Sequence, residues 1–404
     1  MTLPIIITIS ALLLFAYLFD LSASKTRIPS VILLLALGWL VKQITSFLGY
    51  SFPAFANVLP LLGTIGLVLI ILEGALELEI SRSKLKLILK SFLGALSSIL
   101  VLSVSMALTL FYIGDFPFID SLINVIPLCI ISSAIAISSV RDSSPFNREF
   151  VTYESSFSDI IGVLLFNFLV TNDSITIGSF GNFSLQLVLM GIISFIATIG
   201  LSFLLSRIEH HIKFIPIILL VILIYAIAEL WHLPALIFIM LLGLFLGNLK
   251  MIKKIHRIRQ IENLRINELC NEVKRFKELI GEATFLVRSL FFLLFGYLIE
   301  TSEITNIETL GISIAIVIFI YIVRYVQLKL SKLPIMPLLF IAPRGLITLL
   351  LFISITTNRI SFINRSLITQ VVIISVLSMM FGFIFSKGKT TGDLDTQEKL
   401  EAQQ

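Results

Sequence analysis

The sequence predicts an all-α polytopic membrane protein with about thirteen transmembrane helices. Of its 404 residues, 57% are apolar and 14% are charged, against about 25% charged in ordinary soluble proteins. Apolar stretches of roughly 20 residues, enough to cross a bilayer core, recur along nearly the whole chain. They are apolar on every side, as in FIPIILLVILIYAIA at 214–228, whereas the strands of a membrane barrel would alternate.

Charged or turn-rich breaks divide the apolar stretches into the predicted helices. If the first helix runs from outside to inside, the outer side keeps only Lys42, Arg359 and Arg365, and the inner side holds the other basic residues outside the spans. The positive-inside rule therefore supports an odd number of spans and a cytoplasmic C-terminus. The helices are expected to begin near Leu3, Ile28, Leu59, Leu87, Leu122, Val151, Leu185, Phe214, Leu233, Thr284, Leu310, Pro334 and Leu367.

Two segments differ in composition from the apolar helices. Residues 250–281 are strongly charged, and we expect a cytoplasmic amphipathic helix that links two halves of the transmembrane domain, 1–386. A solvated connector that contacts anionic lipid is favoured there over a regulatory role. Residues 387–404 are polar and are expected to form a disordered cytoplasmic tail.

Carboxylates inside the spans are the first candidate functional groups, because a charge at the bilayer centre costs about 2.5 to 3.5 kcal/mol. In the helix that begins near Val151, Asp159 lies about 12 Å along the axis, close to the midplane. Ser155 shares a face with Asp159, as Ser158 does with Glu154. A cluster of such oxygens suits a hard cation.

Two arginines in other spans are expected to compensate the charge of these carboxylates. Arg288 lies in FLVRSLFFLLFGYLI at 285–299 and Arg344 in APRGLITLLL at 342–351. An alternative is that Asp159 and Arg288 form a purely structural buried ion pair.

Two predicted helices have interrupted interiors. The fifth reads PLCIISSAIAISSV at 127–140, and the twelfth, MPLLFIAPRGLITLL at 336–350, contains Pro343 and Gly345 in mid-span. Serine and proline both loosen the helical hydrogen-bond ladder. The two helices are seven spans apart, and an odd offset gives opposite membrane orientations. That arrangement is typical of inverted repeats in secondary transporters, whose sites lie at the breaks.

These motifs, with TRIPSVILLLALGWL at 26–40, ILEGALELE at 71–79 and ESSFSDIIGVLLF at 154–166, resemble the monovalent cation:proton antiporter superfamily, in particular its sodium:proton exchanger branch. The similarity extends from about Leu3 to Phe385. It implies thirteen helices, a dimerisation domain with a homodimer, and a core domain in which unwound helices 5 and 12 cross.

The resemblance also implies residue roles. Asp159 matches the ion-binding and proton-exchanging aspartate, with Glu154 and Ser155 as polar neighbours. Arg288 matches the basic residue of the tenth helix, and Arg344 matches the arginine of a proline-arginine-glycine element that is implied to hold the ion network of the core. Glu73 matches an acid of the third helix that is as readily structural.

Two departures from the family pattern concern ion identity. Ser158 stands where asparagine or aspartate is usual, and Ser132, Ser133 and Ala134 replace a threonine-aspartate-proline element. A shell of Asp159 with these serine oxygens would bind one monovalent cation in competition with a proton.

The function expected is antiport of Na⁺, the first choice, against H⁺ in a multi-pass protein of a prokaryotic plasma membrane. Alternatives are antiport of K⁺, Li⁺ or another small solute, and a transport-inactive sensor or scaffold that signals through 250–277. The lipid bilayer is the expected environment, and no nucleic acid or cofactor is expected. An enzyme is disfavoured because none of the four histidines has metal-ligand spacing.

Overall fold

Apolar helices dominate the structure, a computed structural model that describes residues 2–26, 28–49, 55–78, 80–140, 143–172, 175–207, 214–231, 233–249, 266–355 and 360–385. Within these ranges nine helices are long and apolar enough to cross a membrane, and three shorter apolar helices accompany them. With the broken segment that ends in α15 (Leu346–Ser354), they account for the thirteen predicted passes. The all-helical polytopic prediction is confirmed.

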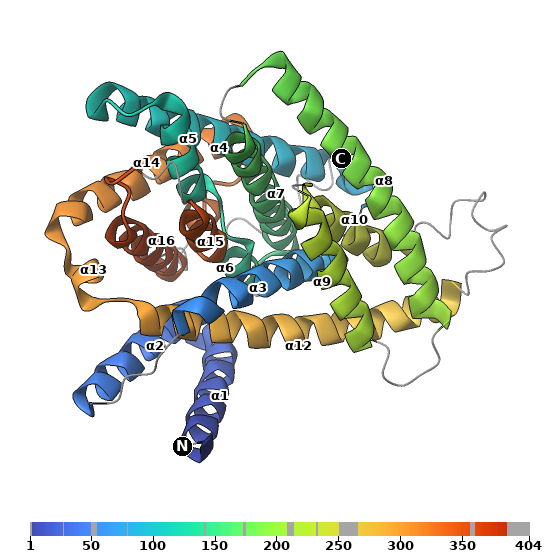
Figure 1. Cartoon of the computed structure of the whole chain (residues 1–404), viewed down its shortest axis with the longest axis horizontal. Coiled ribbons are helices and arrows are strands. Elements are labelled where there is room, and N and C mark those ends of the chain that lie inside the picture. Colours follow the sequence, from blue (N-terminus) through green and yellow to red (C-terminus); the bar gives the residue numbers. More distant parts are fainter. Residues whose placement is uncertain are drawn as a thin grey trace.

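Figure 1 colours the helices by their order along the chain. In chain order they are α1 (Thr2–Thr26), α2 (Ser30–Phe47), α3 (Phe55–Glu77), η1 (Arg82–Lys84), α4 (Leu85–Gly114), α5 (Phe118–Cys129), α6 (Ser133–Ser139), α7 (Pro145–Thr171), α8 (Ile177–Arg207), α9 (Phe214–Leu230), α10 (Ala235–Gly247), α12 (Ile266–Leu298), α13 (Thr301–Thr305), α14 (Ile307–Leu330), η3 (Leu338–Phe340), α15 and α16 (Arg365–Phe385).

Packing divides the helices into two groups. We call α4, α5, α6, α7, α14, α15 and α16 the core bundle, because α4 packs on α5 and α7, and α14 on α16 and α4. We call α1, α2, α3, α8, α9, α10 and α12 the scaffold bundle, in which α12 packs along α2 and α3, and α10 along α3 and α8. In Figure 1, α12 runs as one long helix below α3 and α6. The bundles meet chiefly where α3 contacts α6, α7 and α15.

Close backbone approach holds the scaffold bundle together at the crossing of α2 and α12. A Cβ atom on Gly38 would lie 2.2 Å from the carbonyl oxygen of Leu293, so only glycine fits there. Within a bilayer, helices associate through such van der Waals contact between small residues, because lipid tails are as apolar as leucine.

The predicted linker coincides in part with α12. Residues 266–281 form the first half of this continuous helix, and 250–265, like the predicted tail at 387–404, lie outside the described residues. Leu269, Phe276 and Ile280 are buried along one side, and the Phe276 ring lies 6.1 Å from that of Phe214 in α9. The amphipathic pattern therefore packs this half of α12 against the protein.

Short-range ion pairs join the helices at the predicted outer side. The Nζ of Lys42 lies 2.6 Å from the Oε1 of Glu300, and the Nε of Arg365 lies 3.0 Å from the Oε1 of Glu303 in α13. Arg365 also donates to the carbonyl of Leu298, 2.8 Å away. Two of the three predicted outer basic residues thus tie α2 and α16 to the end of α12, while Arg359 lies outside the described residues.

Glu303 gives a pH-dependent stability prediction. Burial raises the pKa of Glu303 above its ordinary value of 4.5, and Arg365 opposes the shift. The folded protein therefore keeps a proton that the unfolded chain has lost, so the free energy of unfolding falls as pH rises from 4.5 through the raised pKa. Glu303→Gln should weaken this decline. Apparent Tm in detergent between about pH 4 and about pH 7 measures it.

The matched control is Glu308→Gln, because Glu308 is exposed on the next helix. It should leave the pH dependence of the parent unchanged. Equal slopes of Tm against pH in the parent and Glu303→Gln would contradict the assignment.

Candidate ion-binding site

The two broken helices cross at their unwound centres. The predicted fifth helix corresponds to α5 and α6, and the predicted twelfth helix corresponds to η3 and α15. The backbone N–H of Ser132, between α5 and α6, donates to the carbonyl of Pro343, between η3 and α15, at 2.9 Å. The Arg344 Nε donates to the carbonyl of Leu128 at 2.6 Å. The prediction of two discontinuous, crossed helices is therefore confirmed.

Local sequence explains the break before α15. Pro343 has no N–H and disfavours a helical conformation in the residue before it. Gly345 permits close approach, because a Cβ there would lie 2.8 Å from the Ser132 Oγ. Arg344 is fully buried, and its guanidinium donates to carbonyls of Leu128 and Ala342. It satisfies the Leu128 carbonyl, which the end of α5 leaves without a helical partner, and the Ala342 carbonyl before α15.

Helix α7 carries the candidate carboxylate into this crossing. Its first turn is capped by Ser144, whose side chain accepts from the N–H of Asn147 at 3.4 Å. Farther along, the Ser158 Oγ accepts from the N–H of Ile131 at 2.9 Å. The Oδ2 of Asp159 accepts from the N–H of Ser133 at 3.4 Å. Two consecutive residues of α7 therefore bind the break between α5 and α6.

Three oxygens at the crossing have no hydrogen-bond partner among the described residues. They are the Oδ1 of Asp159 and the hydroxyls of Ser132 and Thr348, whose residues are no more than 1% exposed. Thr348 follows Gly345 by three residues, so it lies on the side of α15 that approaches Ser132. Buried polar groups without partners are uncommon and costly. The hydroxyls of Ser121, Thr198, Thr284 and Ser289 are likewise without a hydrogen-bond partner among the described residues, and the crossing is set apart by the Asp159 carboxylate that α7 brings to it.

Ser155 and Ser133 lie beside this group. The Ser155 Oγ donates to the carbonyl of Val151 at 2.7 Å, which leaves its lone pairs able to accept or to bind a cation. Ser133 contributes its backbone N–H to Asp159 and is itself buried. All the serines that the sequence singled out therefore come from α7 or from the break that α7 contacts.

Glu154 has different partners. Its Oε1 accepts from the Nη1 of Arg324 in α14 and from the Nε2 of Gln327, the latter at 2.7 Å. Gln327 in turn accepts from the hydroxyl of Ser98 at 3.3 Å. Sequence reasoning missed Arg324 and Gln327. The available signal was that Arg324, like Arg288 and Arg344, is a basic residue within a span.

Arg288 lies at the boundary of the two bundles. Its Nη2 is 3.7 Å from the Oδ1 of Asp20 in α1. Its Nη1 donates to the carbonyl of Ala134 in α6 at 3.4 Å. The guanidinium thus lies one residue from the Ser133 N–H that binds Asp159. Glu73 lies on α3 near Gly281 of α12, where a Cβ would be 3.6 Å from its carboxylate.

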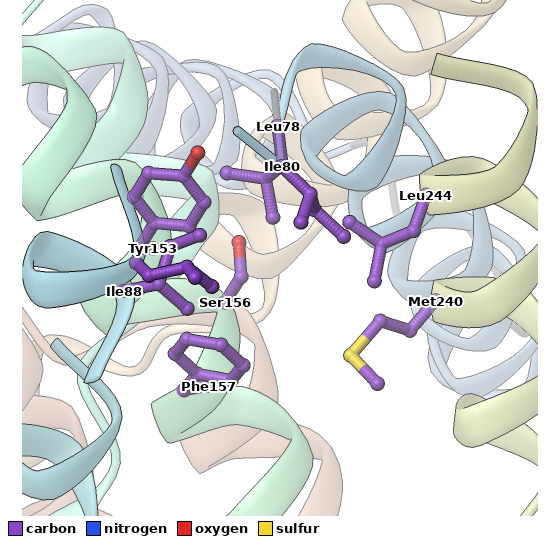
Figure 2. A pocket seen from close by; sticks show the side chains of 9 residues that line it. Leu78, Ile80, Ile88, Tyr153, Ser156, Phe157, Met240 and Leu244 are labelled. Atoms are coloured by element: carbon purple, nitrogen blue, oxygen red, sulfur yellow. The ribbon is translucent and has the colours of Figure 1, made fainter. Parts of the chain in front are cut away.

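An apolar cavity of about 90 Å³ lies beside the predicted inner end of α7. Figure 2 shows Tyr153, Ser156 and Phe157 of α7 on one side and Met240 and Leu244 of α10 on the other. Ser156 precedes Asp159 by one helical turn. The cavity therefore separates the core and scaffold bundles close to the candidate site.

Comparison with known proteins agrees with this architecture. The structure is similar to the sodium proton antiporter MjNhaP1 from Methanocaldococcus jannaschii at pH 8, with a TM-score of 0.64, 17% identity, and coverage of 95% of this chain and 96% of that one. An electron-microscopy structure of MjNhaP1 from the same organism is similar with a TM-score of 0.64, 16% identity and 97% coverage of both chains. No curated protein matches the sequence.

A family model described as the transmembrane sodium/hydrogen exchanger matches residues 10–387, which include every helix that forms the crossing. Together with the multi-pass helical fold, this match identifies an integral membrane transporter of the cation:proton antiporter class. The chain belongs to the sodium/hydrogen exchanger family.

Proposed function

We propose that the chain exchanges one monovalent cation, Na⁺ as first choice, for H⁺ by competition at Asp159. The observation that carries the proposal is the fully buried Asp159 carboxylate with an unpartnered oxygen, bonded to the helix break that holds the unpartnered hydroxyl of Ser132. A bare carboxylate in such surroundings is costly. Either a proton or a dehydrated cation removes that cost, so the two ligands exclude each other.

The expected cation shell consists of oxygens. Asp159 supplies the charge, and Ser132, Ser155 and Thr348 supply hydroxyl oxygens, which suit a hard monovalent ion. Ser158 and Ser133 position Asp159 through the contacts between α7 and the break. Glu154, which the resemblance places next to the site, acts in this proposal through its pair with Arg324.

Transport follows from movement of the core bundle against the scaffold bundle. The core carries both broken helices and Asp159, while α3 of the scaffold contacts it at α6, α7 and α15. In secondary transporters with broken helices, such rocking exposes a central site to each side in turn. We further propose a homodimer in a prokaryotic plasma membrane with a cytoplasmic C-terminus, on the basis of the resemblance and the basic residues.

One observation supports Na⁺ as the transported ion, and another supports K⁺. The printed name of MjNhaP1, a sodium proton antiporter, supports Na⁺. The serines at 132, 133 and 158, in place of the usual asparagine and carboxylate, support K⁺ as the second candidate.

The experiment is proton-gradient dissipation in proteoliposomes on addition of Na⁺, K⁺ or Li⁺. A response to Na⁺ supports the first choice, and a response to K⁺ alone supports the second. Silence to all three cations in folded, inserted protein would contradict monovalent cation antiport. It would favour a sensor or scaffold, or an untested cargo.

A further inference from the structure

The contacts of Asp20 extend the ion site into the scaffold bundle. Asp20 lies in α1, where its Oδ1 accepts from the hydroxyl of Ser30 at 3.3 Å and lies 3.7 Å from the guanidinium of Arg288. The side chains of Arg288 and Asp20 are 8% and 20% exposed. Helices α1, α2 and α12 therefore converge on one carboxylate.

Arg288 connects this carboxylate to the core bundle. Its other nitrogen donates to the carbonyl of Ala134, which follows the residue whose N–H binds Asp159. The positively charged Arg288 guanidinium of the scaffold bundle is thus held beside the break at which a transported cation would bind. In a low-dielectric interior, a positive charge at this position opposes the entry of another cation.

We propose that Asp20 is a positioning residue of the ion site. Its carboxylate holds the Arg288 guanidinium at the helix break and offsets its charge, and so sets the affinity of Asp159 for the cation. This inference rests on the proposed function and goes beyond it, because Asp20 lies in α1, outside the two broken helices and α7. It predicts that the effect of removing Asp20 depends on the presence of Arg288.

A double-mutant cycle tests this dependence. Asp20→Asn leaves the Arg288 charge without this partner, and we expect the apparent KM for the cation to rise about tenfold with a smaller change in maximal rate. Arg288→Gln should lower the KM. The double variant should return the KM to within about threefold of the parental value, and Asp20→Glu should stay close to the parent.

The matched control is Glu149→Gln. The Oε1 of Glu149 lies 2.8 Å from the Nζ of Lys84 in a partly exposed ion pair. Glu149 is near the start of α7, and Lys84 directly precedes α4, so the pair lies within the core bundle. This variant should leave the KM unchanged. If Asp20 is merely structural, the double variant will be no better than Asp20→Asn, and that result would overturn the inference.

A second readout separates this inference from the proposed function. Cation-dependent stabilisation in detergent, measured as the rise of Tm with Na⁺, K⁺ or Li⁺ concentration, reports binding without transport. The parent, Asp20→Asn, Arg288→Gln and the double variant should rank in cation affinity as they do in the KM. Asp20→Asn should bind the cation most weakly, and the parent and the double variant should bind it alike. Absence of flux in the parent would reject antiport, whereas an unchanged binding midpoint in Asp20→Asn would reject the role of Asp20.

Discussion

Asp159→Asn is expected to abolish cation-dependent proton movement in proteoliposomes and to leave a folded, inserted protein. Asparagine has nearly the same shape, and its carbonyl oxygen still accepts from the Ser133 N–H. It has neither a negative charge for the cation nor a group that takes up a proton, so both halves of the exchange are lost. The rate should fall to that of protein-free vesicles.

Asp115→Asn is the control for this variant. Asp115 is exposed beyond the end of α4 with φ of 53°, a conformation that asparagine tolerates. Its transport should equal that of the parent. Exchange that persists in Asp159→Asn at the parental rate would remove Asp159 from the site.

Arg324→Ala is expected to have the largest effect on stability. Arg324 and Glu154 are both 1% exposed and are paired through hydrogen bonds that Gln327 shares. Removing one partner of a buried pair leaves the other charge uncompensated, which costs about 3 to 5 kcal/mol. The apparent Tm in detergent, or the midpoint of denaturant unfolding, measures the loss.

Two further variants separate charge from packing. The double variant Glu154→Gln with Arg324→Gln removes both charges and should recover much of the stability. Arg275→Ala is the control, since Arg275 is 71% exposed and 3.8 Å from Glu272, and it should cost less than about 1 kcal/mol. A loss in Arg324→Ala no larger than in this control would refute the structural role of the pair.

Local patterns in the sequence were sufficient for the fold, and they propose one half of the candidate site. Continuous apolar stretches predict the spans, and Pro343 with the serines near Ser132 predicts the two breaks. Depth along a helix places Asp159 near the midplane. These inferences need only helical geometry and the cost of charge in a bilayer.

The partners of the buried charges could not be obtained in this way. Whether Glu154 faces Asp159 or Arg324 depends on how α7 is rotated against α14, which apolar composition does not determine. Asp20 carries no signal in the sequence, because it lies close to the predicted end of its helix, where charges are common. Thr348 carries no local signal, since its unpartnered hydroxyl is evident only after α15 is placed against the break.

Competition between the two ions at one carboxylate is the central claim, and the pH dependence of transport kinetics in the parent tests it most directly. Initial rates of proton movement would be measured against cation concentration at several pH values in the acid range. Competition predicts that the apparent KM for the cation rises as pH falls, up to about tenfold per pH unit, while the maximal rate is retained. A KM that stays constant while the maximal rate falls would contradict a shared site.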